Sequence, residues 1–163
     1  MAPGAGGPGG TQEVLVLKVS TRVRYGVRAL VQIAGARPGA SIPVQEIARG
    51  QRVSVKYLEH IVAALKTAGL VRSARGTRGG YALARPPKSI RLSEVIRALE
   101  GPPVVVECVD APETCCRHAT CAARDVWVRI RKAIDGVLDG TSLEDLLEAA
   151  RSKDGSAPLS YTI

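Results

Sequence analysis

Apolar residues recur every three or four positions in several parts of the chain, which is the spacing of one face of a helix. The first such face follows an N-cap at Ser20 or Thr21 and ends near residues 35–38. A second face follows a cap at Ser54 and runs to Ala68. The first consists of Val23, Val27, Leu30, Val31 and Ala34, and the second of Leu58, Ile61, Val62 and Leu65. We therefore expect two amphipathic helices in the N-terminal half.

A short helix precedes the second of these. Pro43 opens it, residues 44–49 form it and Gly50 stops it, so that a short connection leads to Ser54. Two helices joined by so tight a turn predict a helix-turn-helix motif, whose second helix contacts DNA. The residues expected to reach bases and phosphates are Ser54, Lys56, Tyr57, Glu59 and His60. Taken alone, His60 is more often an ordinary surface histidine.

A glycine-rich hairpin follows directly. We expect strands at Leu70–Ser73 and Tyr81–Ala84, because the glycines between them allow the positive φ angles of a tight turn. The turn is not a phosphate-binding P-loop, since neither its lysine motif nor a helix follows. A basic hairpin in this place predicts a wing that lies along DNA. The residues expected to contact DNA are Arg72, Arg75, Thr77 and Arg78 of the hairpin, with Arg22 and Arg24 of the first helix. For the last two, simple solvent exposure is the alternative.

The C-terminal part predicts further helices on both sides of a loop. Ser93 caps a helix over Glu94–Leu99, and a capping box of Thr141 and Glu144 starts a last helix that ends at residue 150 or 151. Between them lies an apolar stripe formed by Ala123, Val126, Trp127, Ile130, Ile134, Val137 and Leu138. We expect this stripe to pack against a second copy of the chain. The alternative is packing against the first helix of the same chain.

These elements predict a mostly α fold with a small β-hairpin, namely a winged helix-turn-helix domain plus a long C-terminal dimerisation helix. We expect a disordered extension at residues 1–16, the winged domain at 17–100 and a cysteine loop at 101–122, followed by the dimerisation and last helices at 123–151 and a flexible tail at 152–163. The extension is too rich in glycine, proline and alanine to offset the entropic cost of ordering it.

Composition indicates a location and a polyanionic partner. The 163 residues include no Phe and one Trp, so the core must be aliphatic. No apolar run reaches the roughly 20 residues that cross a bilayer, and the N-terminus does not look like a signal peptide, so we expect a cytoplasmic protein without a membrane partner. Residues 18–91 carry 15 basic and two acidic residues, a net charge of +13, whereas the rest carries −5. This asymmetry favours a nucleic-acid partner over a merely solvated basic surface. Since helix-turn-helix dimers usually bind two half-sites, we expect that partner to be double-stranded DNA with a palindromic operator.

All four cysteines lie within the fourteen residues from Cys108 to Cys121. The spacing Cys108-x6-Cys115-x5-Cys121 is too wide for the paired knuckles of structural zinc, and it suits a flexible loop around a bulkier iron–sulfur cluster. Zinc binding and redox-active thiols remain open as alternatives. A purely disulfide-bonded loop is disfavoured, because nothing else in the chain indicates secretion.

The chain resembles the Rrf family of winged helix-turn-helix transcriptional regulators over roughly residues 17–149. The resemblance lies in the runs LKVSTRVRYGVRAL, VSVKYLEHIVAALKTAGLVRSARGTRGGYALARP and VIRALEG, and in the three spaced cysteines followed by RDVW. It implies a homodimer with an iron–sulfur cluster, 2Fe–2S or 4Fe–4S, held by Cys108, Cys115 and Cys121. In one branch of the family a histidine three residues after the last cysteine completes the site, and in another an aspartate near the start of the first helix does so; here these positions are Arg124, which cannot ligate a metal, and Arg24. His118 is the leading candidate for the fourth ligand. The alternatives are Glu107, Asp110 or Glu113, a residue from the first helix of a second copy, or an exchangeable small ligand.

The combined prediction is a DNA-binding transcriptional regulator that senses redox, nitric oxide or iron–sulfur status. Gain, loss or oxidation of the cluster would reshape the loop and change the relative pose of two recognition helices. One alternative is a zinc- or thiol-based regulator of the same fold. Another, of a different class, is an iron–sulfur electron-transfer or cluster-carrier protein, which would not need a helix-turn-helix. No enzyme is expected, because the two histidines form no nucleophile–base pair.

Overall fold

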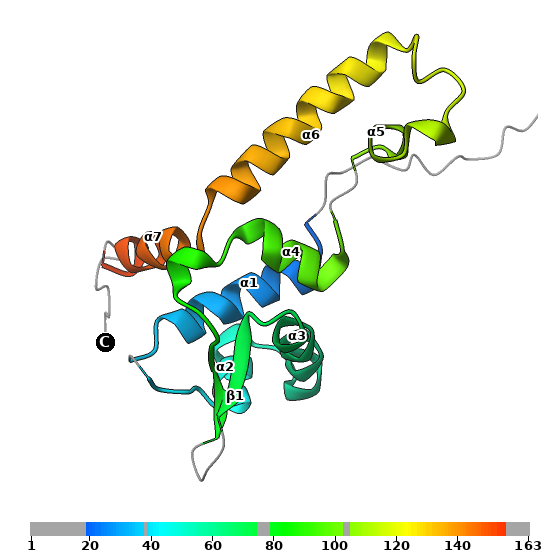
Figure 1. The fold of residues 1–163 in the computed structure, drawn as a ribbon. Helices are drawn as coiled ribbons and strands as arrows, with labels where there is room; N and C mark the ends of the chain where they lie inside the picture. Colours follow the sequence, from blue (N-terminus) through cyan, green and yellow to red (C-terminus); the bar gives the residue numbers. More distant parts are fainter. Residues whose placement is uncertain (1–18, 38, 75–78, 103–104, 156–163) are drawn as a thin grey trace, which may run out of the picture.

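The computed structural model describes residues 19–37, 39–74, 79–102 and 105–155. In these residues the fold is mostly helical with one antiparallel two-stranded hairpin (Figure 1), as the sequence predicts. The elements are α1 (Thr21–Ala34), α2 (Val44–Gln51), α3 (Val55–Thr67), β1 (Val71–Ala74), β2 (Gly80–Leu83), η1 (Pro87–Ser89), α4 (Leu92–Glu100), α5 (Glu107–Asp110), η2 (Pro112–Thr114), α6 (Ala122–Gly140) and α7 (Leu143–Gly155). The predicted extension at residues 1–16 lies outside the described residues. No described helix is long and apolar enough to span a membrane.

An aliphatic core joins α1, α2, α3, α4 and α7. The stripe of α3 is buried as its periodicity predicts, and its four side chains are Leu58, Ile61, Val62 and Leu65. On α1 the buried surface is wider than one stripe, since Ala29 and Ile33 are buried while Val27 is only partly buried. The reason is that α1 contacts α2, α3, α4, α7 and β2, so it is covered from several sides.

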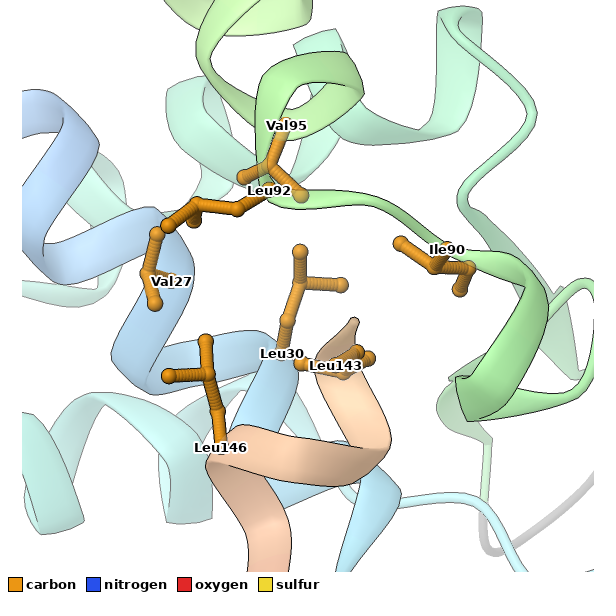
Figure 2. Close-up of a pocket in the computed structure, with 7 residues that line it drawn as sticks. All are labelled: Val27, Leu30, Ile90, Leu92, Val95, Leu143 and Leu146. Atoms are coloured by element: carbon orange, nitrogen blue, oxygen red, sulfur yellow. The ribbon is translucent and has the colours of Figure 1, made fainter. Parts of the chain in front are cut away.

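The last helix, α7, belongs to this core. Figure 2 shows aliphatic side chains of α1, α4 and α7, together with Ile90 between η1 and α4, around a common space. They are Val27, Leu30, Ile90, Leu92, Val95, Leu143 and Leu146. The space between them is too small for a water molecule. This close packing anchors the end of the chain to the helix-turn-helix.

The turn of the helix-turn-helix differs from the prediction at one end. The Ser54 hydroxyl accepts a hydrogen bond from the Tyr57 N–H at 3.2 Å, so the predicted cap of α3 is confirmed. Gly50 does not stop α2, which continues to Gln51. A Cβ at Gly50 would lie 2.7 Å from Oε1 of Gln32, so the end of that flexible side chain would have to shift if the glycine were replaced. The chain leaves α2 at Arg52, which adopts a left-handed conformation with φ 55° and ψ 44°.

The wing strands are present but begin and end near, not at, the predicted residues. Val71 pairs with Leu83 and Ala74 with Gly80, while Leu70 is a buried residue before the first strand. The backbone of Tyr81 also exchanges two hydrogen bonds with Ile42, at 2.9 and 3.0 Å, which ties the hairpin to the segment before α2. The tip, residues 75–78, lies outside the described residues, and with it Arg75, Thr77 and Arg78.

The start of α4 is fixed by a carboxylate and not by the predicted cap at Ser93, which lies inside the helix. Glu94 accepts a hydrogen bond from the Arg91 N–H at 3.0 Å and forms an ion pair with Arg85 at 2.6 Å. Burial alone would raise the pKa of Glu94, but these two partners lower it overall. Glu94 therefore holds the start of α4 to the end of the wing.

The start of α7 is capped by Ser142, one residue after the predicted Thr141. The Ser142 hydroxyl accepts from the Asp145 N–H at 3.2 Å, and the Asp145 carboxylate accepts from the Ser142 N–H at 2.8 Å. Hydrogen bonds from Ser142 lower the pKa of Asp145. The helix then continues to Gly155, past the expected tail boundary at residue 152. Residues 156–163 lie outside the described part.

We expect Ser142→Ala to lower the free energy of unfolding by about 1 kcal/mol, because it removes the cap of a helix that completes the core. Thr141→Ala is the matched control. It removes a hydroxyl that bonds only to the Val137 carbonyl at 2.7 Å, so its effect should stay within about 0.5 kcal/mol. Urea denaturation at one fixed protein concentration measures both. A larger loss for Thr141→Ala than for Ser142→Ala would contradict this assignment of the cap.

Candidate DNA-binding face and cysteine segment

The first two turns of α3 present the five residues that the sequence singles out. Ser54, Lys56, Tyr57, Glu59 and His60 are all exposed, on the side opposite the buried stripe. We call these five residues the recognition face. Its side chains include hydrogen-bond donors, acceptors and an aromatic ring, which is what readout of base edges and phosphates requires.

An aromatic contact from α1 supports the recognition face. The rings of Tyr25 and Tyr57 meet edge to face, with centroids 6.1 Å apart and an interplanar angle of 88°. The guanidinium of Arg28 lies 5.8 Å from the centroid of the Tyr25 ring. Edge-to-face pairs of this kind fix ring orientation. Tyr25 therefore orients Tyr57, a role that the helical periodicity of α1 did not indicate.

Of the other predicted DNA contacts, Arg22, Arg24 and Arg72 lie within the described residues; all three are exposed and belong to other elements. Arg22 and Arg24 occupy the first turn of α1, which contains no acidic residue, and Arg72 lies on β1. Arg24 also borders an apolar groove of about 410 Å³ between the start of α1, α4, the end of α6 and α7. The groove is lined by Val19, Val23, Arg24, Tyr25, Val27, Arg28, Leu92, Ile96, Leu138 and Leu146.

The helix α6 projects from the domain (Figure 1) and none of its 19 residues is buried. Val126 is 49% exposed and Val137 65% exposed, and both belong to the predicted apolar stripe. The far end of α6 meets α5, η2 and the turn that precedes Cys121. We call residues 107–121 the cysteine segment.

The structure does not gather the predicted metal ligands. Cys108, Cys115 and Cys121 are partly buried, Cys116 is exposed, and all four thiols are free. Among the described residues there is no group of three or more His, Cys, Asp or Glu side chains that could hold a metal ion. The candidate fourth ligand, His118, is exposed, and its Nδ1 lies 2.9 Å from the Cys115 carbonyl oxygen. In this conformation the cysteine segment does not fit an iron–sulfur cluster.

Two arginines of α6 hold the cysteine segment in place. Arg124 Nε donates to the Cys108 carbonyl at 3.2 Å. Arg131 pairs with Asp110 of α5 and also with Asp135 one turn along α6, at 2.9 Å. The hydrogen bond to Asp135 and the nearby Asp110 carboxylate raise the pKa of Arg131 above its ordinary value. The position of the segment is thus coupled to α6 through one ion pair and one hydrogen bond, which cysteine spacing could not reveal.

A family model described as Rrf2, iron-dependent transcriptional regulator, matches residues 19–149. The chain belongs to the Rrf2 family. It is 40% identical over 130 residues to the transcriptional regulator CymR of Bacillus subtilis, a match that covers 80% of this chain and 89% of that protein. It is 32% identical over 131 residues to the regulator IscR of Aliivibrio salmonicida, covering 80% and 77% of the two chains.

Solved structures of Rrf2 regulators share the fold. The structure of B. subtilis CymR superposes with a TM-score of 0.69 and 40% identity, covering 82% of this chain and 98% of CymR. The structure of T. potens IscR gives a TM-score of 0.70 at 35% identity, covering 90% and 97%. The predicted family, the winged-helix fold and the assignment to regulators and not to enzymes are confirmed. Iron–sulfur binding by this chain is not confirmed. The family contains both CymR and IscR, so membership alone does not identify a cofactor.

Proposed function

We propose that this Rrf2-family regulator acts as a homodimer that binds double-stranded DNA through the recognition face and the wing, under control of the cysteine segment. The observation that carries the proposal is the exposed recognition face at the start of α3, in a half of the chain with a net charge of +13 over residues 18–91. Such a charge is favourable against phosphates, and the face supplies groups for base readout. We further propose that the wing contacts DNA through Arg72, Arg75, Thr77 and Arg78. Arg22 and Arg24 are proposed to contact phosphates of the DNA backbone.

The proposed dimer follows from α6. Most of the stability of a helix in a protein comes from packing of its apolar face, and α6 has no fully buried residue within one chain. Its apolar stripe needs a cover, and the apolar groove beside α1 and α4 offers a surface of the same kind. A second copy of the chain can cover the stripe with its groove and fill the groove with its stripe. Two copies also place two recognition faces on a palindromic operator, with a spacing set by the dimer.

The cysteine segment is the proposed sensor. A similar regulator is described as the global cysteine regulator of B. subtilis, and the S. aureus CymR structure was also solved in an oxidised form, at 36% identity. The four thiols are free, and Cys116 is exposed, which supports a thiol-based sensor. Thiols of this kind stay reduced in a cytoplasmic setting.

An iron–sulfur cluster is the second candidate, supported by the family description and by the similarity to IscR. Cys108, Cys115 and Cys121 are its proposed ligands, with His118 as the proposed fourth. Ligation would require the cysteine segment to change conformation. In either case Arg124 and Arg131 transmit a change in the segment to α6 and so to the spacing of the two recognition faces.

Binding to duplex DNA should weaken steeply with salt, because each neutralised phosphate releases counterions. Lys56→Ala and Glu59→Ala should alter the sequence preference of the protein, and each lost base contact should cost about 1–3 kcal/mol of discrimination. Arg129→Gln, an exposed substitution on α6, is the control and should change neither property. Fluorescence anisotropy with duplexes selected from a random library measures this. Affinity independent of salt would contradict DNA binding by the basic half.

Ile134→Asp should convert the dimer to monomer or unfold it, because an unpaired carboxylate would be placed in the proposed interface at a cost of several kcal/mol. Lys132→Asp is the matched control, since Lys132 is exposed on the same helix outside the apolar stripe. It should remain dimeric. Sedimentation equilibrium at micromolar concentration measures the association. A wild-type protein that sediments as a folded monomer would contradict the proposal.

The DNA affinity of the wild type should differ by roughly tenfold between the fully reduced protein and the oxidised or metal-loaded protein. Cys108→Ala, Cys115→Ala and Cys121→Ala should each remove the difference, while Cys116→Ala, the control, should keep it. Iron and sulfide analysis of anaerobically purified protein separates a cluster from a thiol sensor. If the difference survives in all three variants, or is lost only in Cys116→Ala, the segment is not the sensor as assigned.

A further inference from the structure

Arg52 lies directly after α2, in the turn of the helix-turn-helix, and is the one described non-glycine residue with a positive φ angle. Its φ of 55° and ψ of 44° place it in the left-handed region. There the Cβ of an L-amino acid crowds the following carbonyl, so glycine or asparagine is usual and arginine is disfavoured. A position that favours glycine therefore carries an arginine.

The backbone leaves Arg52 no alternative conformation. The Arg52 N–H donates to the Arg49 carbonyl at 3.1 Å, and the Val53 N–H donates to the Ala48 carbonyl, also at 3.1 Å. These two bonds form a Schellman motif, whose central residue must be left-handed. The partly buried Val53 packs against the core beside α2. The strain at Arg52 is therefore imposed by the fold and cannot relax locally.

The same chain solves the same problem with glycine one helix later. At the end of α3 the Gly69 N–H donates to the Lys66 carbonyl at 3.0 Å, and the Leu70 N–H donates to the Leu65 carbonyl at 2.9 Å. Gly69 occupies the position equivalent to Arg52, with φ 70°. The two Schellman motifs thus share one hydrogen-bond pattern, but the left-handed position is glycine in one and arginine in the other. This comparison indicates that Arg52 is present for its side chain.

That side chain is exposed and makes no hydrogen bond or ion pair with any residue that the structure describes. Arg52 lies two residues before Ser54, the cap of α3, and four residues before Lys56 of the recognition face. Phosphates flank the groove that a recognition helix enters, and residues around the start of that helix reach them. A long cationic side chain is suited to this contact.

We propose that Arg52 is a phosphate anchor of the DNA complex, which fixes how α3 enters the groove. The inference rests on the proposed DNA-binding role of the recognition face. Its rival is a structural role in which the cation stabilises the C-terminal end of α2 through the helix dipole. The two roles predict opposite effects of Arg52 on the stability of the free protein. An anchor contributes to DNA affinity at the expense of the free protein's stability, whereas a helix-stabilising cation contributes to stability.

The test compares Arg52→Gly with Arg52→Lys, and uses Lys88→Gln as a control for loss of an exposed cation on η1. Thermal unfolding gives Tm at one fixed concentration. Fluorescence anisotropy from 0.05 to 0.3 M salt gives affinity for a duplex that the wild type selects from a random library. Arg52→Gly should keep or raise Tm, by roughly 1–3 °C, because it relieves the left-handed strain. It should weaken DNA binding roughly 3–10-fold at about 0.1 M salt and reduce the slope of log K against log salt by about 0.9 per lost contact.

Arg52→Lys should keep the wild-type slope, because the charge remains, and Lys88→Gln should keep both Tm and slope. Wild-type affinity and slope in Arg52→Gly would overturn the anchor. So would a lower Tm in Arg52→Gly, since that is the signature of the structural role. If the wild type binds no duplex at any salt concentration, the proposed function itself fails, and the role of Arg52 fails with it.

Discussion

The helix α6 is only partly covered by its own chain, through contacts with α4 and α5, and the proposed dimer depends on this. At its C-terminal end, α7 continues into the core through the buried Leu143 and Leu147. In its N-terminal half, Arg124 and Arg131 bind the cysteine segment. Between these ends no residue is buried, although the apolar stripe is present. Because apolar surface is unfavourable in water, the stripe calls for a partner surface.

This arrangement separates the proposed DNA-binding face from the proposed sensor. The recognition face belongs to a domain whose aliphatic core lies within one chain. The cysteine segment precedes α6 and is linked to it through Arg124 and Arg131, and α6 projects from the domain (Figure 1). In the proposed dimer, a change at the segment would reach α3 without disturbing the core, by altering how two copies of α6 pack. Membership of the Rrf2 family does not choose between thiol and cluster chemistry, because that choice depends on the local geometry of the segment.

Much of the fold could be predicted because several elements bury one face only. The stripe of α3 has the period of a helix packed on one side, so Leu58, Ile61, Val62 and Leu65 were identified correctly. The burial of α1 was less predictable, since four helices and a strand surround it. The predicted cap of α7 was wrong because two neighbouring residues, Thr141 and Ser142, can each cap a helix and the sequence does not show which one does. Gly50 was misread because α2 continues past it and the left-handed position that ends the helix is taken by Arg52. Cysteine spacing limits how far apart ligands can lie but does not bring them together.

The claim that α6 is buried between two copies is tested most directly by amide hydrogen exchange along this helix in the wild-type protein. If a second copy covers the stripe, the amides from Val126 to Leu138 exchange far more slowly at micromolar concentration than in an isolated helix, and their protection falls as the protein is diluted below the dissociation constant. Exchange along α6 that is as fast as in an unprotected helix at every concentration, while the α3 amides remain protected, would contradict the account.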